Sequence, residues 1–396
     1  MKSQLYKNIN YRFVIINVPN ILNILIPIFL LPIVIHSTGI VEFGKLIYYQ
    51  GIIGILLIIS ENGLNTISLS VLNKINSEII VYHVILIKLL ISVVLLGLIF
   101  FFVPITDVFI FFTLYLSVFG QAVNVSYLYI FNKNETKYSL LLMGVKLISM
   151  LIYLGFLNKG ILIYALFLGV SDILIGMSSL IFSGSFRKII STRIDLSLFK
   201  SLWKRGFNFT KINLLSSGYS LALPIYLKFF MGFEIIGVYG AIEKVYRGFC
   251  NISAPFNLIL LGEGSFKSIG NFFDIKQVRL FFILFILSLI FVGIFSENIM
   301  VYLISEVEFE TYKFSFLISL LIPIVVFFSR IFVINFYVKN SLENNLFSIY
   351  LSVFLISIPM NIFSIYFFGL IGCILAALLI EVICLYKLNL KIKTIL

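Results

Sequence analysis

The chain has 396 residues, of which 61% are hydrophobic and only 12% are charged, and its formal net charge is +12. So few charged side chains cannot cover a water-soluble globule of this size, and the connections between the apolar runs are too short to fold alone. The positive charge does not indicate a nucleic-acid-binding protein, because no basic segment is combined with exposed aromatic residues or a recognition helix. The composition therefore indicates an integral membrane protein.

About twelve apolar runs follow one another along the chain, and each can cross a hydrocarbon layer about 30 Å thick. We expect every run to be helical, because an open strand in lipid leaves backbone amides and carbonyls unpaired. The first run is too long for a signal-peptide core, so we expect it to be retained. The predicted spans are residues 13–35, 46–70, 82–103, 108–131, 139–157, 161–183, 207–229, 235–262, 280–296, 314–338, 347–367 and 370–388.

The connection after the sixth span is the most basic one and divides the chain into two halves. We expect an N-terminal six-helix lobe at residues 1–190, a basic cytoplasmic linker at 191–206 and a C-terminal six-helix lobe at 207–396, packed around a central cavity. Apolar residues around Trp203 recur at helical spacing in the linker, so it is either a helix at the headgroup level or an ordinary charged loop. A faint echo relates the halves: Pro27 precedes Gly44 as Pro224 precedes Gly240. The echo is either a parallel repeat, as in many transporters, or chance.

Lysine and arginine gather in alternate connections, which predicts the orientation of the chain. With the N-terminus in the cytoplasm, 19 cations fall on the cytoplasmic side and only Lys45, Lys159 and Lys313 on the other. We therefore expect both termini to be cytoplasmic. The cysteines Cys250, Cys373 and Cys384 all lie in apolar runs without metal-ligand spacing, so we expect them to be buried packing residues and predict no metal site.

Seven cations remain within or at the rims of the predicted spans. Exposing all of them to lipid would cost on the order of 20 kcal/mol, at about 2.5 to 3.5 kcal/mol each. Lys88, Lys211 and Lys228 lie near span ends, where a long side chain can reach the headgroups. The others lie deeper, and either pair with intramembrane acids or line a cavity. The candidates for a cationic, anion-binding cavity are Lys146, Lys211, Lys244, Arg247 and Arg330.

Three acidic residues share the predicted interior and are candidates for coupling transport to H⁺ or Na⁺: Asp172, Glu243 and Glu381. Each has a structural alternative. Asp172 is placed to pair with Lys146 or to form hydrogen bonds with Ser171 and neighbouring polar groups, and Glu243 lies four residues before Arg247 on one helix face. Even if that pair forms, Lys244 remains as a further cation within the same arc of the helix. We therefore expect a polar cavity with an excess of positive charge, which attracts anions.

Several segments resemble the O-antigen flippase (Wzx-type) family of polysaccharide transporters, within the superfamily of multidrug, oligosaccharidyl-lipid and polysaccharide exporters. These segments are Gly39-Ile40-Val41-Glu42-Phe43-Gly44-Lys45, Ser60-Glu61-Asn62-Gly63-Leu64-Asn65, Phe131-Asn132-Lys133-Asn134-Glu135 and, above all, Gly237-Val238-Tyr239-Gly240-Ala241-Ile242-Glu243-Lys244-Val245. The chain departs from the family pattern at Leu261-Gly262-Glu263-Gly264-Ser265, where relatives often have a proline before the serine.

The resemblance implies a flippase of the bacterial inner membrane, with no cofactor and no enzymatic activity. It would move undecaprenyl-diphosphate-linked oligosaccharide repeat units, of O-antigen or a similar surface polysaccharide, to the periplasmic leaflet by alternating access. Membrane lipids and other polysaccharide assembly proteins are the implied partners, and nucleic acid is not.

Two alternatives stay open at this point. One is a multidrug exporter or an exporter of another lipid-linked precursor, although a drug exporter would favour carboxylates over cations in its cavity. The other is a membrane polysaccharide polymerase, for which the longest outer connection, about Ser296 to Lys313, is short and has no arginine.

Overall fold

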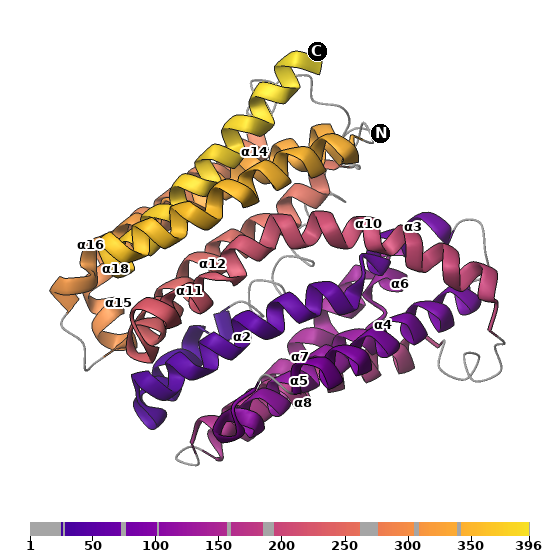
Figure 1. Ribbon diagram of the computed structural model, residues 1–396, viewed down its shortest axis with the longest axis horizontal. Coiled ribbons are helices and arrows are strands. Elements are labelled where there is room, and N and C mark those ends of the chain that lie inside the picture. The colour runs from indigo at the N-terminus through magenta and orange to yellow at the C-terminus, as the bar shows by residue number, and fades with distance from the viewer. Residues whose placement is uncertain are drawn as a thin grey trace. The chain divides into compact units, whose positions relative to one another are not determined.

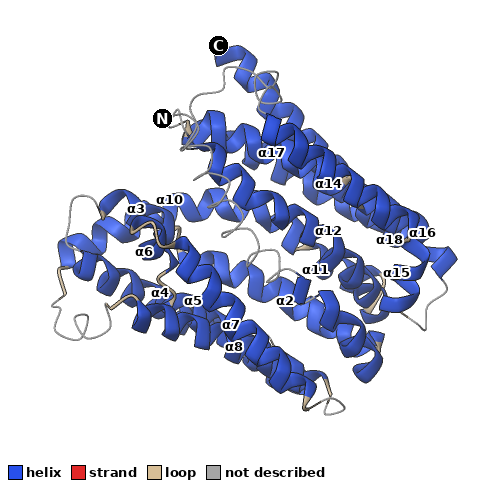
Figure 2. Cartoon of the chain, turned by 180° about the vertical axis from the view of Figure 1, so that it is seen from behind, coloured by secondary structure: helices blue, strands red, loops and turns tan. Residues whose placement is uncertain are grey.

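The computed structural model describes residues 25–26, 28–72, 77–100, 103–156, 160–184, 194–261, 276–304, 309–338 and 342–395. Every regular element in these ranges is a helix (Figure 2). The apolar helix Ile28–Thr38 comes first. It is followed by α2 (Ile40–Glu61), α3 (Leu64–Val71), α4 (Ser77–Phe100), η1 (Ile105–Asp107), α5 (Val108–Val123), α6 (Ser126–Phe131), α7 (Glu135–Leu154), α8 (Ile161–Phe182), α10 (Leu196–Leu221), α11 (Leu223–Phe230), α12 (Phe233–Leu261), α14 (Lys276–Ile294), α15 (Ser296–Leu303), α16 (Phe309–Ser319), α17 (Ile322–Phe332), η2 (Val333–Val338) and α18 (Glu343–Ile395) (Figure 1).

The predicted all-helical membrane fold is confirmed. Among the described residues, seven helical segments are long and apolar enough to cross a membrane, or eight when the bent pair Phe282–Ile294 and Ser296–Leu303 is counted as one span. The count of about twelve stays a prediction. The predicted first span, 13–35, falls largely outside the described residues, and α10 and α12, which carry four charged side chains each, are not among the seven.

The last apolar segment contains two helices joined at a break. Gly369 interrupts α18 with φ 56° and ψ −131°, and this separates the predicted spans 347–367 and 370–388. A positive φ favours glycine. A side chain here would also approach Met231, whose Cε would lie 3.0 Å from an added Cβ. The break therefore needs glycine for both conformation and space.

The contacts divide the described chain into two compact units. We call Lys45–Ala222 the N-terminal unit, and Pro27–Gly44 together with Leu223–Leu396 the C-terminal unit. The chain leaves the N-terminal unit between α10 and α11, and α10 packs on α3 and α4. Helix α10 also continues without interruption through the second half of the basic linker, residues 196–206. Residues 185–193 lie outside the described residues, and the lobes at 1–190 and 207–396 stay a prediction.

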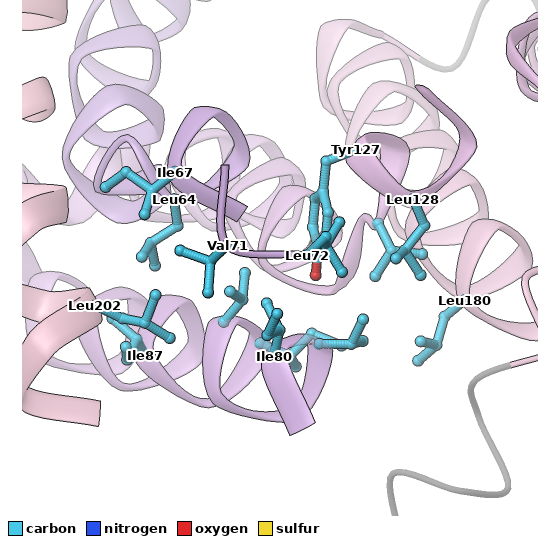
Figure 3. Packing of buried hydrophobic residues seen from close by; sticks show 14 of the residues in the cluster. Leu64, Ile67, Val71, Leu72, Ile80, Ile87, Tyr127, Leu128, Leu180 and Leu202 are labelled. Carbon is cyan, nitrogen blue, oxygen red and sulfur yellow. The ribbon is translucent and has the colours of Figure 1, made fainter. Parts of the chain in front are cut away.

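In the N-terminal unit, α4, α5, α7 and α8 lie side by side (Figure 1). Glycine lets α5 and α8 approach closely: a Cβ at Gly169 would lie 2.0 Å from the carbonyl oxygen of Thr113, and one at Gly176 would lie 2.2 Å from that of Gly120. Small residues at such crossings favour helix association in membranes. Figure 3 shows a second part of this core, where Tyr127 of α6 points toward Leu72.

In the C-terminal unit, the start of α2 crosses the start of α12 at two glycines. A Cβ at Gly44 would lie 1.8 Å from the carbonyl oxygen of Phe233, and one at Gly237 would lie 2.3 Å from that of Ile40. The aromatic residues Phe43 and Tyr239 beside this crossing are fully buried. Two segments that carry the sequence resemblance therefore meet in the fold, and their glycines serve packing.

Candidate functional site

The ionisable residues of α12 form a bonded network in the C-terminal unit. Arg247 and Glu243 form an ion pair, with 2.7 Å between Nη2 and Oε1. The Tyr239 hydroxyl donates to the same Oε1 at 3.1 Å and lies 3.4 Å from the hydroxyl of Tyr246. The spacing of four residues places these groups on one face of α12. Of the alternatives open for Glu243, the structure shows the ion pair.

Two further charged residues approach this network from other helices. Arg330 of α17 donates from Nη1 to the backbone carbonyl of Cys250 on α12. Glu381 of α18, like Arg330 and Arg247, is close enough to the Cys250 thiol to interact with it electrostatically. Three helices thus bring Glu243, Arg247, Arg330 and Glu381 into one region, which we call the α12 cluster.

Lys244 is a further cation on α12. It follows Glu243 directly, and its side chain is half-buried and has interactions of its own. With Lys244, this region holds three cations and two carboxylates. Fixed cations in a wall of low dielectric constant attract anions more strongly than the same cations in water.

A second charged pair lies in the N-terminal unit. Asp172 of α8 is within hydrogen-bonding reach of Ser117 on α5 and interacts electrostatically with Lys146 of α7. The closeness of α5 to α8 explains this position, because a Cβ at Gly120 would lie 2.4 Å from the backbone carbon of Asp172. Of the partners that the sequence suggested for Asp172, Lys146 is present, whereas the hydroxyl beside it is that of Ser117 and not that of Ser171, which donates to the backbone carbonyl of Leu168. Lys146 is therefore associated with Asp172.

The structure also reveals a buried lysine that the sequence placed wrongly. Lys88 was expected near a span end, but α4 begins at Ser77, about one and a half turns earlier than predicted, so Lys88 lies at the middle of the helix. Its side chain is 0% exposed, and Nζ donates to Oδ1 of Asn65 at 2.7 Å. Glu61 interacts with it electrostatically, and the Tyr127 ring centroid is 6.0 Å from Nζ. A predicted span that began at Ser77 would have placed Lys88 at its middle.

Lys88 faces the point where the span Ile40–Leu69 is broken. Asn62 and Gly63 separate α2 from α3 with φ values of 48° and 58°. The Asn62 Oδ1 accepts from Thr210 of α10 at 2.9 Å, while its Nδ2 is buried without a hydrogen-bond partner among the described residues. At this position the side-chain amides of Asn62 and Asn65 connect helices, as polar side chains do at helix interfaces in membranes.

The remaining candidate cation is Lys211 of α10. It is exposed on α10, with Nζ 4.6 Å from the centroid of the Phe207 ring. Lys228 of α11 similarly lies 3.6 Å from the Phe233 ring centroid. These cations lie against aromatic rings, which attract them electrostatically.

Three further features concern the cysteines, the metal ligands and a cavity. The cysteines Cys250, Cys373 and Cys384 are free and buried, as predicted. No group of three His, Cys, Asp or Glu side chains suited to a metal ion occurs within the residues that the structure describes. A cavity of about 310 Å³ lies between α17 and α18, lined by Phe328, Phe332, Val382, Leu385, Tyr386 and Asn389.

Comparison with solved structures shows where this fold occurs. The lipid II flippase MurJ, in an inward closed conformation, superposes with a TM-score of 0.76 and 14% identity, over 96% of this chain and 87% of MurJ. A mutant of the Vibrio cholerae MATE transporter VcmN gives a TM-score of 0.61 and 13% identity, over 98% of this chain and 97% of that one. A eukaryotic MATE transporter gives 0.59 and 16%, over 98% and 96%.

No protein-family model and no curated protein sequence matches the chain. The similarity to MurJ and to MATE transporters is therefore one of fold, at identities too low to carry function by themselves.

Proposed function

We propose that the protein is a flippase of the bacterial inner membrane, which moves an undecaprenyl-diphosphate-linked oligosaccharide repeat unit from the cytoplasmic to the periplasmic leaflet by alternating access. The observation that carries this proposal is the α12 cluster with Lys244. It supplies fixed positive charge in a fold that MurJ, a lipid II flippase, shares over 96% of this chain.

The chemistry of the substrate explains why these charges are needed. A lipid-linked oligosaccharide has a diphosphate and sugars that cannot cross hydrocarbon, whereas its lipid tail can stay in the membrane. Lys244, Arg247 and Arg330 are proposed to hold the diphosphate, since arginine binds phosphate through two parallel N–H donors. Lys146 belongs to the second pair and Lys211 to the exposed face of α10, so neither is assigned to this site.

Coupling to an ion gradient is proposed to use the acids within the helices. Asp172 is the first candidate, because it combines a carboxylate, a hydroxyl and a lysine at a close helix crossing. Intramembrane acids with such partners serve as proton relays in transporters. Glu243 and Glu381 are the other candidates, and their proximity to arginines links ion binding to the proposed anion site.

The similarity to MATE transporters supports one alternative, an exporter of drugs or other small molecules. The excess of cations over carboxylates around α12 favours an anionic substrate and opposes this alternative for cationic drugs. An exporter would protect cells from added drugs, whereas a flippase of a polysaccharide precursor would not.

The proposal is tested in cells that lack the chromosomal gene. Full-length protein should restore surface polysaccharide, whereas Lys244→Gln with Arg247→Gln should not, although it reaches the membrane in normal amounts. Lys228→Gln with Lys211→Gln removes the same charge outside the proposed site and serves as the matched control. Normal polysaccharide in cells that carry the Lys244/Arg247 variant would overturn the assigned site, and normal polysaccharide in cells that lack the protein would overturn the function.

A further inference from the structure

Helix α10 has one face that packs inside the N-terminal unit. Leu202, Gly206 and Thr210 recur every four residues and are buried. A Cβ at Gly206 would lie 2.4 Å from the backbone oxygen of Asn62, and Thr210 donates to the side chain of Asn62. This face therefore holds α10 against the break between α2 and α3.

A neighbouring face of α10 combines large apolar side chains with lysines. Among its apolar side chains, Leu196 is 68% exposed, Trp203 is 41% exposed and Phe207 is 53% exposed. The lysines are also exposed, and all six side chains fall within roughly 100° of arc at 3.6 residues per turn. We call this set the outer face of α10: Leu196, Lys200, Trp203, Lys204, Phe207 and Lys211.

Aromatic contacts hold parts of the outer face in place. The rings of Phe199 and Trp203 stack with centroids 6.1 Å apart, and Lys211 lies over Phe207. The face is too charged for the hydrocarbon core, and α10 is not among the helices apolar enough to cross a membrane. It is also too apolar for open water. Helices with exposed tryptophan, phenylalanine and leucine beside lysine lie at the boundary between headgroups and acyl chains.

We propose that the outer face of α10 binds the headgroups of anionic phospholipids. Lys200 and Lys204 contact the lipid phosphates, while Trp203 and Phe207 lie at the level of the upper acyl chains. Lysine stems extend along apolar surface and place the ammonium group among the phosphates. Each lysine near an anionic leaflet contributes attraction that decreases within a Debye length. This interaction does not depend on the transported substrate.

The chain contains its own reporter, because Trp203 is the single tryptophan. We reconstitute the full chain in bilayers with equal amounts of phosphatidylglycerol and phosphatidylcholine, and place bromine on the acyl chains of one lipid at a time. Bromine quenches tryptophan only at short range. Brominated phosphatidylglycerol should quench Trp203 more than brominated phosphatidylcholine, corresponding to roughly three- to ten-fold local enrichment.

Substitution separates headgroup binding from simple contact with lipid. Lys200→Gln with Lys204→Gln should bring the two lipids to equal quenching. Lys133→Gln with Lys137→Gln removes the same charge from two exposed positions, one between α6 and α7 and one in the first turn of α7, and should keep the preference. Equal quenching by both lipids in the unmodified protein, no quenching by either, or a preference that survives the Lys200/Lys204 substitution would each overturn the proposal.

Discussion

Glu243 and Arg247 lie one turn apart on α12 and are joined by an ion pair of 2.7 Å. Their side chains differ in environment, since the carboxylate side chain is 10% exposed and that of the arginine 35%. Tyr239 also donates to this carboxylate. The charge of Glu243 is thus compensated by two neighbours on its own helix, and removal of the arginine leaves it with only the tyrosine on that helix.

Arg247→Gln should therefore destabilise the protein more than the double substitution Glu243→Gln with Arg247→Gln. The single change leaves a buried carboxylate with reduced compensation, whereas the double change leaves two neutral amides. We expect a loss of about 1–2 kcal/mol for the single change, reduced from the value for a fully buried pair by the exposure of the arginine. Thermal unfolding of the purified protein in detergent measures it, and a double variant less stable than the single one would contradict this interpretation.

Gly176→Ala should lower the melting temperature, because its Cβ would lie 2.2 Å from the carbonyl oxygen of Gly120. The helices α5 and α8 must then separate, at a cost of about 1–3 kcal/mol. Gly144→Ala is the matched control on α7, since nothing lies within 4 Å of its added Cβ. Alanine is the better helix former by about 1 kcal/mol, so the control should be as stable as the unmodified protein or more so. Equal melting temperatures for the two variants would exclude the close crossing.

The start of α10 should depend on pH through Asp195, which lies outside the membrane-spanning helices. The Ser197 hydroxyl and the amides of Leu198 and Ser197 donate to this carboxylate and hold its pKa below the ordinary value. A lowered pKa in the folded state means a stabilising contribution that is complete above the ordinary aspartate pKa of about 4 and is lost as the pH falls through the folded value.

Asp195→Asn tests this contribution, because the amide oxygen still accepts from the helix amides but the group no longer titrates. The variant should show a smaller decrease of melting temperature as the pH falls from about 5 to 3. If the unmodified protein and the variant lose stability in parallel over this range, Asp195 does not contribute as described.

The proposed orientation is tested with single cysteines at two exposed positions. A cysteine at Glu297, at the start of α15, should react with an impermeant thiol reagent from the periplasmic side, and one at Lys200 should react only after the inner membrane is permeabilised. Background labelling should be low because all three natural cysteines are buried. The reverse pattern would place both termini outside the cytoplasm.

The sequence predicted the parts of the structure that follow from local pattern. The apolar runs predicted helices, and the spacing of Glu243 and Arg247 predicted that the two could meet. Contacts between distant segments were not accessible in this way. The buried position of Lys88 depends on where α4 begins, and its partner Asn65 lies on another helix beyond a break.

Close glycine crossings were also outside the reach of the sequence. Gly120, Gly169 and Gly176 look like ordinary residues in apolar runs, and only the packing of α5 on α8 shows why no side chain fits there. The limits of α10 could not be predicted from the sequence either. Its pattern of buried and exposed residues continues from the basic linker into the predicted seventh span without a boundary.

The central claim is that Lys244, Arg247 and Arg330 hold an anionic lipid-linked group during its passage. Proteoliposomes that contain the full chain and a fluorescent undecaprenyl-diphosphate-linked oligosaccharide measure this passage, when the label in the outer leaflet is destroyed by an impermeant reductant. We expect the unmodified protein to expose the inner-leaflet label much faster than protein-free vesicles, and the variant with glutamine at all three positions to match the protein-free rate. Passage by that variant at the unmodified rate, or no passage by the unmodified protein, would contradict the claim.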